Sequence, residues 1–306
     1  MRRGKQKPPI AIVTDFGAVD PYVGIMKAVM LRIDPGLAFI DLCHELPPYG
    51  VLSASYVLCS AWPYLPNGAV VLAVVDPGVG SARRELIARA QGRVVVSPDN
   101  GTVSLLARLA GPLECFRAER GLLDELTAAK PRWSSTFDGR DLFAPLAAKA
   151  AAFGPEAICG ETVPAPVLLP EASPGILDPG QGARTASSLQ GSVIHLDRFG
   201  NCVSSVHFED VYGHRVKEIR VYRGRDHSGG PALVLDGVRD HFSEVGVGEP
   251  LAYWGSAGFL EVAVREASAA ARFRFAVGSV LLAVLDAPVE PMSSGDPDGT
   301  AHSEDG

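Results

Sequence analysis

Hydrophobic and polar residues alternate between two patterns along the first half of the chain. Apolar runs of strand length occur at 10–14, 37–42, 69–75 and 93–97. Apolar residues at helical spacing occur at 22–33, 51–62, 103–109 and 142–153. This succession of strand and helix predicts an α/β N-terminal domain with a largely parallel central sheet.

The pattern changes after residue 161. The segment 161–182 contains five prolines and three glycines without periodicity, which is typical of a linker. Short strand-like runs follow it, at 192–196, 203–206, 218–221, 232–235, 251–254, 259–264 and 280–285. They predict a smaller β-barrel-like or sandwich-like C-terminal domain. We therefore expect an α/β domain at 8–165, a linker at 166–188, a β-rich domain at 189–287 and a disordered tail at 288–306.

Composition and charge narrow the class of protein. Hydrophobic residues make up 47% of the chain and charged residues 21%, as in a globular protein with a substantial core. The formal net charge of −7 gives no global positive field, so we expect neither nucleic acid nor a membrane as a partner. The five cysteines are scattered, and we see neither a signal peptide nor an apolar run of the roughly 20 residues that a membrane span needs. A soluble, cytoplasmic protein without a metal site is the resulting expectation.

Three polar segments follow or precede these predicted elements. Asp15 comes directly after the first strand, Asp76 and Arg83 follow the apolar strand at 69–75, and Asp138 precedes the last helix of the domain. An Asp after a strand is more often a helix cap or turn residue than a functional group. Because ligands gather at the carboxyl ends of strands in open α/β sheets, the convergence of all three segments favours a binding site.

Several ordered motifs resemble those of the S-adenosylmethionine (SAM) hydrolases, also called SAM hydroxide adenosyltransferases, which are related to SAM-dependent fluorinases and chlorinases. The resemblance extends from about residue 10 to 286 in the same order as in the family. The motifs are TDFG at 14–17, DPYVGIMK at 20–27, DLCHELPP at 41–48, VVDPGVG at 74–80, SPDNG at 97–101, STFDGRDLFAP at 135–145, DRFGN at 197–201 and GSAGFLEVAV at 255–264.

The resemblance implies a homotrimer whose sites lie between the N-terminal domain of one subunit and the C-terminal domain of the next. Asp15 would bind the ribose hydroxyls, since a carboxylate accepts two hydrogen bonds. The other implied substrate contacts are Asp197 with the methionine ammonium group, Ser256 near its carboxylate, Asn201 at the adenine edge, and Phe242 and Tyr49 against the purine and ribose.

The implied reaction is in-line attack of water or hydroxide on the ribose 5′-carbon, which releases methionine and leaves adenosine. It needs no cofactor, because the sulfonium is already a good leaving group. Asp76 would orient the water, and the permanently charged Arg83 would stabilise a hydroxide. The family's usual His falls on Asp138, and a carboxylate is a weaker base than His near neutral pH. Asp138 would either regain basicity from a neighbouring carboxylate or only position the water.

Two further departures concern the C-terminal domain, where Arg265 and Ala257 replace residues that relatives use near the substrate. Three other functions remain as alternatives. A halogenase would need a halide site, which Asp76 and Asp138 oppose by repulsion between like charges. A non-catalytic adenosyl-ligand-binding protein would bind SAM without cleaving it. A metal-dependent phosphoesterase would use Asp15, Asp76 and Asp138 as ligands, with Arg83 opposing a bound cation.

Overall fold

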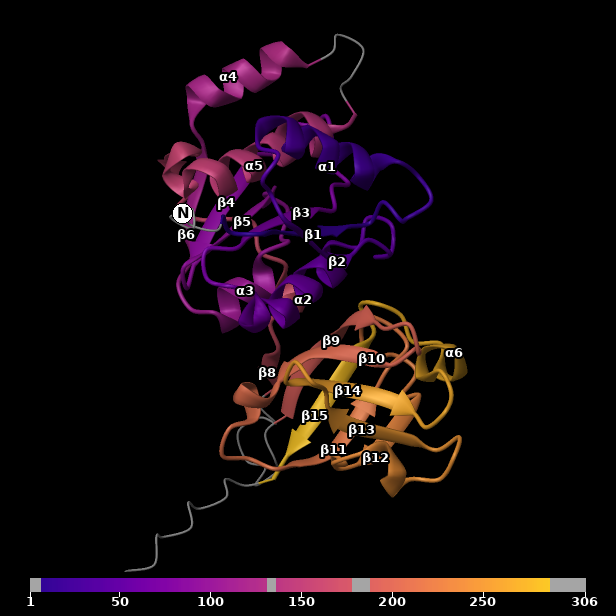
Figure 1. The fold of residues 1–306 in the computed structure, drawn as a ribbon. Helices are drawn as coiled ribbons and strands as arrows, with labels where there is room; N and C mark the ends of the chain where they lie inside the picture. The colour runs from indigo at the N-terminus through magenta and orange to yellow at the C-terminus, as the bar shows by residue number, and fades with distance from the viewer. Residues whose placement is uncertain (1–6, 131–135, 178–187, 287–306) are drawn as a thin grey trace, which may run out of the picture.

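A computed structural model describes residues 7–130, 136–177 and 188–286. Figure 1 shows two lobes, an α/β lobe formed by the first half of the chain and a β-rich lobe formed by the second. The tail expected at 288–306 and part of the expected linker lie outside the described residues. The two-domain α/β organisation predicted from the sequence is confirmed, while the exact boundaries stay predictions.

The sheet of the first lobe has seven strands in the order β2-β1-β3-β5-β4-β6-β7. Their bounds are β1 (Ile10–Thr14), β2 (Phe39–Cys43), β3 (Val70–Val74), β4 (Glu85–Ala90), β5 (Arg93–Pro98), β6 (Glu114–Ala118) and β7 (Cys159–Thr162). The neighbours among β2, β1, β3 and β5 pair in parallel, and β4, β6 and β7 are added antiparallel. The sheet is therefore mixed, and the prediction of a largely parallel sheet is not confirmed.

The antiparallel part of the sheet begins at the β4–β5 hairpin. Gln91 and Gly92 connect the two strands with φ values of 49° and 73°. Positive φ at both central residues is the geometry of a two-residue type I′ turn, whose twist matches that of the flanking strands. No strand was predicted from the sequence at 85–90, so the strand that reverses the direction of the sheet was missed.

Helices cover both faces of this sheet (Figure 1). Their bounds are α1 (Tyr22–Ile33), α2 (Val51–Ala61), η1 (Trp62–Tyr64), α3 (Ser104–Leu109), α4 (Arg120–Ala129), the π-helical turn η2 (Gly139–Phe143), α5 (Ala144–Phe153) and η3 (Pro155–Ala157). Side chains alternate along the fully buried strand β3: Val70, Leu72 and Val74 face the core under α1 and α5, while Val71 and Ala73 face the core under α2 and α3. The four helices predicted from spacing are confirmed.

The second lobe is a near-closed antiparallel barrel-like sheet, as the spacing of its short strands predicts. Its bounds are β8 (Gly175–Leu177), β9 (Ser188–Leu196), β10 (Cys202–His207), β11 (Val216–Val221), β12 (Leu233–Asp236), β13 (Pro250–Trp254), β14 (Phe259–Val264) and β15 (Val280–Leu285). The strand order is β12-β11-β15-β9-β10-β14-β13, with β8 on β9. A bridge between Arg239 and Tyr253 links the two ends of this order. Short helices lie at η4 (Pro170–Ala172), η5 (Phe208–Val211), η6 (Phe242–Glu244) and α6 (Ala269–Phe273).

An apolar cluster joins the two lobes. Leu105 of α3 packs with Ile194, Val203 and Phe259 of the barrel strands. Next to the cluster, Arg108 Nη1 donates hydrogen bonds of 2.9 Å to the carbonyl oxygens of both Ala172 and Ser205. The first lobe is therefore tied to the barrel by both apolar packing and charged hydrogen bonds.

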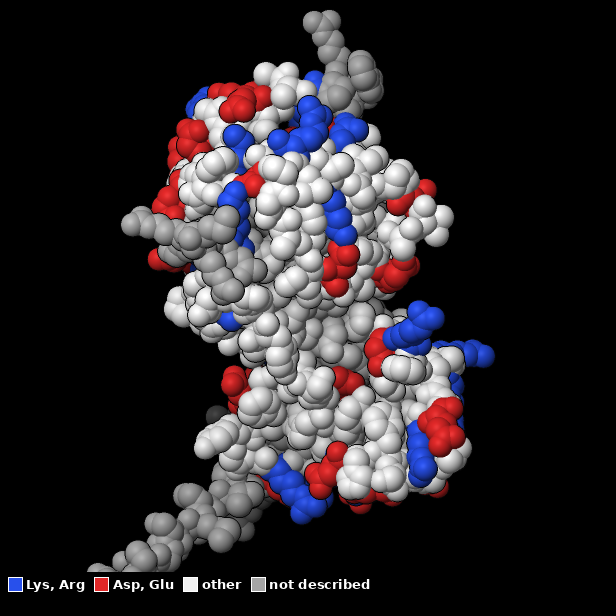
Figure 2. Space-filling view, viewed as in Figure 1, with Lys and Arg blue, Asp and Glu red and all other residues white. Residues whose placement is uncertain are grey.

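Figure 2 shows basic and acidic residues interspersed on one face of the molecule. The two lobes meet at a narrower waist in the same view. Within the described part of the chain, no helix combines the length and the apolar character needed to cross a bilayer.

Replacing Arg108 by Met should destabilise the protein, because its side chain is mostly buried and its hydrogen bonds span the two lobes. We expect the free energy of unfolding to fall by about 2–3 kcal/mol. Urea titration followed by circular dichroism measures it, with Arg120→Met, at the exposed start of α4, as the control. Equal stabilities of the two variants would contradict this role.

Candidate functional site

A hollow of about 360 Å³ opens at the carboxyl ends of β1 and β3. Asp15 and Asp76 reach it from the residues that follow these strands, and Asp138 reaches it from the residue that precedes η2. Tyr49 lines the same hollow. The structure thus brings together the three polar segments that the sequence analysis expected to meet at this sheet edge. We call this space the N-terminal hollow.

Arg83 bridges two carboxylates beside this hollow. Its Nε lies 3.0 Å from both Oδ1 and Oδ2 of Asp76, and its Nη2 lies 2.6 Å from Oδ2 of Asp138. Burial alone would lower the pKa of Arg83, but hydrogen bonds and charges from Asp76 and Asp138 outweigh it and raise the pKa. Arg83 is therefore a fixed cation, and its guanidinium joins the two carboxylates directly.

Lys130 adds a second cation, which the sequence analysis missed. Its Nζ lies 2.5 Å from Oδ1 of Asp138, whose Oδ2 is bound by Arg83. Four side chains of alternating charge are consequently in contact one after another: Asp76, Arg83, Asp138 and Lys130. We call this group the ion chain. Lys130 follows α4 and lies outside the recognised motifs, shortly before the one at 135–145, and 23% of its side chain is exposed. No local pattern marks such a residue as part of a site.

The aromatic ring of Phe143 packs against Arg83 of the ion chain. Its fully buried ring lies 5.0 Å from the guanidinium carbon of Arg83, a cation–π distance. Phe143 ends the π-helical turn η2, and Asp138 caps the start of the same turn. Single π-turns occur often at functional sites, since the extra residue re-aims the side chains around it. Here the turn carries Phe143 and follows Asp138, and both residues contact Arg83.

Asp15 is held against the loop that follows β2. The backbone N–H of Tyr49 donates a 2.7 Å hydrogen bond to Oδ2 of Asp15. Tyr49 itself has a φ of 64°, in the left-handed region that non-glycine residues rarely adopt, and its side chain is largely exposed. The Asp15 hydrogen bond and the tight turn before it keep Tyr49 at the rim of the N-terminal hollow.

The remaining predicted residues line a different hollow, of about 750 Å³, in the barrel lobe. They are Asp197, Asn201, Phe242 and Ser256. None of the described residues that line the N-terminal hollow also lines this one. We call it the C-terminal hollow. Within one chain, the predicted site residues therefore lie in two separate hollows.

Asp197 and Asn201 form one rigid turn between β9 and β10. Oδ1 of Asp197 accepts hydrogen bonds from the backbone N–H groups of Phe199 and Asn201, at 2.9 and 2.8 Å. Its Oδ2 accepts one from Nδ2 of Asn201, at 2.8 Å. The Asn201 side chain therefore presents its remaining groups in an orientation that Asp197 fixes.

The C-terminal hollow also contains residues that the sequence analysis did not single out. Glu261 is 7% exposed, and the hydroxyl of Tyr253 donates a 2.5 Å hydrogen bond to its Oε2. Tyr253 packs against Phe242 with 4.8 Å between ring centroids. Tyr56 enters this hollow from α2 of the first lobe. A carboxylate inside the apolar run 259–264 is a signal that could have identified Glu261.

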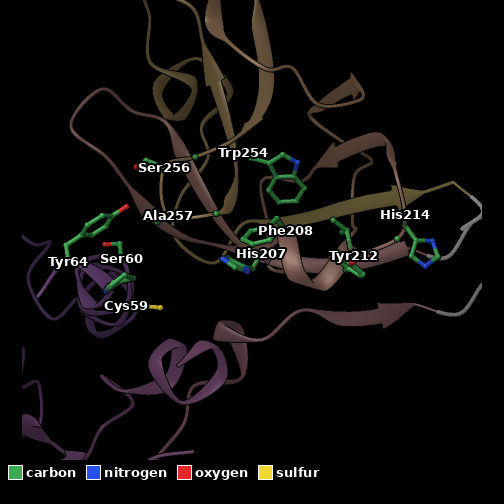
Figure 3. A pocket seen from close by; sticks show the side chains of 15 residues that line it. Cys59, Ser60, Tyr64, His207, Phe208, Tyr212, His214, Trp254, Ser256 and Ala257 are labelled. Atoms are coloured by element: carbon green, nitrogen blue, oxygen red, sulfur yellow. The ribbon is translucent and has the colours of Figure 1, made fainter. Parts of the chain in front are cut away.

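The structure places Arg265 and Ala257, the two C-terminal residues that differ from those of the relatives. Nη1 of Arg265 donates a 2.8 Å hydrogen bond to the carbonyl oxygen of Val245, directly after η6. Arg265 thus braces the segment that carries Phe242. Ala257 lines a third hollow, of about 770 Å³, between α2 with η1 and the barrel. Figure 3 shows His207, Phe208 and the turn carrying Ser256 and Ala257 on one side of it, with Cys59, Ser60 and Tyr64 on the other.

Glu261 makes the stability of the protein depend on pH. Burial raises its pKa above the ordinary value of 4.5, and Asp197 adds to this, while the Tyr253 hydrogen bond opposes it. The folded state thus binds the proton more tightly than the unfolded state, and the ionised carboxylate costs stability as pH rises from 4.5 through the raised pKa.

Glu261→Gln should therefore gain melting temperature relative to the unsubstituted protein as pH is raised from 4.5 to 8, since the amide removes the buried charge. Differential scanning calorimetry across this range measures the trend. Glu244→Gln is the matched control with the opposite sign, because backbone hydrogen bonds from His241 and Asp240 lower the pKa of Glu244. A pH-independent difference for Glu261→Gln would contradict the assignment.

Comparison with known proteins places this chain in a family. The SAM hydroxide adenosyltransferase N-terminal domain matches residues 10–158, and the corresponding C-terminal domain matches residues 191–282. The chain is 41% identical to the (R)-S-adenosyl-L-methionine hydrolase of Thermus thermophilus, over 85% of this chain and 93% of that protein. It is 36% identical to the hydrolase of the same name from Salinispora tropica, over 86% and 92%.

More distant relatives and a solved structure agree with this assignment. The chain is 24% identical to a fluorinase of Actinoplanes sp., over 89% of this chain and 95% of that protein. An uncharacterized conserved protein from Thermotoga maritima, of known crystal structure, superposes with a TM-score of 0.72 at 32% identity, covering 90% of this chain and 99% of that one. The chain belongs to the SAM hydroxide adenosyltransferase family.

Proposed function

We propose that the protein hydrolyses S-adenosyl-L-methionine to adenosine and L-methionine. The observation that carries this proposal is the ion chain, in which Arg83 joins Asp76 to Asp138 beside the hollow that Asp15 also lines. The hydrolases of Thermus thermophilus and Salinispora tropica support it, since their names state the same reaction and they match most of this chain.

The reaction requires one water molecule and one displacement. The water oxygen forms a bond to the ribose 5′-carbon, the carbon–sulfur bond breaks, and its electron pair stays on the sulfur of methionine. One proton is released from the attacking water. Catalysis then consists of holding the water in line with the breaking bond and excluding other solvent from it.

Asp76 and Asp138 are suited to orient that water. A carboxylate accepts hydrogen bonds through several lone pairs, so each accepts one from water while it stays bound to Arg83. Both oxygens of Asp138 already contact a cation. This arrangement favours positioning of the water over proton abstraction by Asp138, and Arg83 lies close enough to stabilise charge that develops on the attacking oxygen.

We assign the substrate-binding roles according to which hollow each residue lines. Asp15, with Tyr49 beside it, would bind the ribose hydroxyls. Asp197 would bind the methionine ammonium group, and Ser256 would lie near its carboxylate. Phe242 would stack against the adenine and Asn201 would contact its edge. These roles stay predictions, as do the absence of a cofactor and of a nucleic-acid partner and the cytoplasmic location.

The alternatives fit the hollow less well. A halide ion beside Asp76 and Asp138 would meet two carboxylates in a partly buried site, where like charges repel strongly. A metal ion between these carboxylates would compete with the guanidinium of Arg83 for the same oxygens. A protein that binds the adenosyl group without cleaving it remains open to direct test.

Incubation of the purified protein with SAM should yield adenosine and methionine in equal amounts, measured by liquid chromatography with mass detection. Asp76→Asn and Arg83→Met should each lower kcat by about 100-fold or more, because each removes a group that holds the water or stabilises its charge. Arg84→Met is the matched control, since Arg84 pairs with Asp99 rather than with the ion chain. Binding of SAM without adenosine would overturn the hydrolase, and 5′-chloro-5′-deoxyadenosine formed in chloride would favour the halogenase.

The separation of the two hollows leads us to propose that each site is built from two subunits of a homotrimer. A variant with a defective N-terminal hollow, Asp76→Asn, should then complement one with a blocked C-terminal hollow, Ser256→Trp. Co-expression in equal amounts should restore about a quarter of the unsubstituted activity, because a quarter of the sites would combine two intact halves. Activity no higher than that of the separate variants would contradict a shared site.

A further inference from the structure

The N-terminal hollow holds more negative charge than Arg83 alone neutralises. Asp76 and Asp138 both bind this one guanidinium, and Asp15 lines the same space. Their side chains are mostly buried, at 7% exposure for Asp76 and 11% for Asp138. A partly buried carboxylate without its own counter-charge raises the free energy of any anionic or electron-rich group nearby.

Lys130 supplies that counter-charge from outside the recognised motifs. It lies 2.5 Å from Oδ1 of Asp138, on the opposite oxygen from the one that Arg83 binds. The two carboxylates on the ion chain are thus matched by two cations. The same pair of contacts fixes the plane of the Asp138 carboxylate, because each oxygen is held from a different side.

The fold delivers Lys130 to this position through helix α4. Leu122 and Leu126, one turn apart on α4, are buried in the core that also contains Leu142 of η2. The helix then ends at Ala129, and Lys130 follows it as the C-cap residue with an extended backbone. Figure 1 shows α4 as the outermost helix of its lobe.

We propose that Lys130 is a positioning residue for the attacking water, acting through Asp138. It neutralises the second carboxylate of the ion chain and holds its plane, so that a free lone pair of Asp138 points at the water. This inference rests on the proposed SAM hydrolysis and adds to it a residue that does not touch the substrate.

A purely structural role makes different predictions. If the Lys130–Asp138 contact merely tethered α4, then another ion pair of α4 would matter equally. Lys149 of α5 provides this comparison, because its Nζ lies 3.9 Å from Oε1 of Glu125 on α4 and its side chain is 27% exposed, against 23% for Lys130. The Lys149 pair lies outside the residues that line the hollow.

The experiment measures kcat and KM for adenosine formation in Lys130→Met, Lys130→Arg and Lys149→Met, with circular dichroism as a check of folding. Lys130→Met should lower kcat by about 10- to 100-fold while KM changes by less than about threefold, because Lys130 acts on the water and not on the substrate. Lys130→Arg should recover most of the lost rate, and Lys149→Met should match the unsubstituted enzyme.

A double-mutant cycle keeps the test decisive even where Lys130→Met is unstable. Once Asp138→Asn has removed the charge, adding Lys130→Met should lower kcat by less than about twofold further. The inference would be overturned if Lys130→Met lowered kcat equally in the unsubstituted protein and in Asp138→Asn. It would also be overturned if Lys130→Met kept the kcat of the unsubstituted protein. Either result would leave SAM hydrolysis in place. Failure of the unsubstituted protein to form adenosine would overturn the proposed function first, and this inference with it.

Discussion

The site depends on one guanidinium shared by two carboxylates. Arg83 binds Asp76 in the loop after β3 and Asp138 at the start of η2, so one side chain joins two segments that are far apart in the sequence. Burying these charges is tolerable only because they are paired, and removal of one partner would leave the others uncompensated. Arg83 therefore links the loop, the π-turn and the aromatic ring of Phe143 through direct contacts.

The two hollows differ in electrostatic character, and the difference suits the proposed substrate. In the N-terminal hollow, cations from Arg83 and Lys130 accompany the carboxylates of the ion chain. In the C-terminal hollow, burial raises the pKa of Glu261, and the nearby charge of Asp197 adds to this. Under the proposed function, the N-terminal hollow, whose carboxylates are paired with cations, holds the attacking water. The acidic C-terminal hollow receives the ammonium end of SAM.

Much of the fold could be predicted from the sequence, because the apolar runs and helical spacing report burial directly. The runs at 10–14 and 69–75 became β1 and β3, and the polar residues after them met at one sheet edge. The direction of β4 could not be predicted in this way, since it depends on a two-residue turn at Gln91 and Gly92.

Part of the candidate site could also be predicted from the sequence. Asp76 lies inside a contiguous motif and Arg83 shortly after it, so both are identified by their neighbours in sequence. Lys130 and Tyr253 lie just outside the motifs at 135–145 and 255–264, and what links them to the candidate site is a side-chain bond, to Asp138 and to Glu261 respectively. Local sequence does not encode such contacts, so they became visible only in three dimensions.

The junction between the lobes has a consequence for assembly. Arg108 and the apolar cluster around Leu105 fix the angle at which the barrel is held against the α/β lobe. If the N-terminal hollow of one copy meets the C-terminal hollow of the next, the contact is head-to-tail, and this angle sets the rotation from copy to copy. A rotation of one third of a turn closes a ring of three, whereas a rotation that does not close would propagate an open filament. The few side chains at the waist would then determine the symmetry of the whole particle.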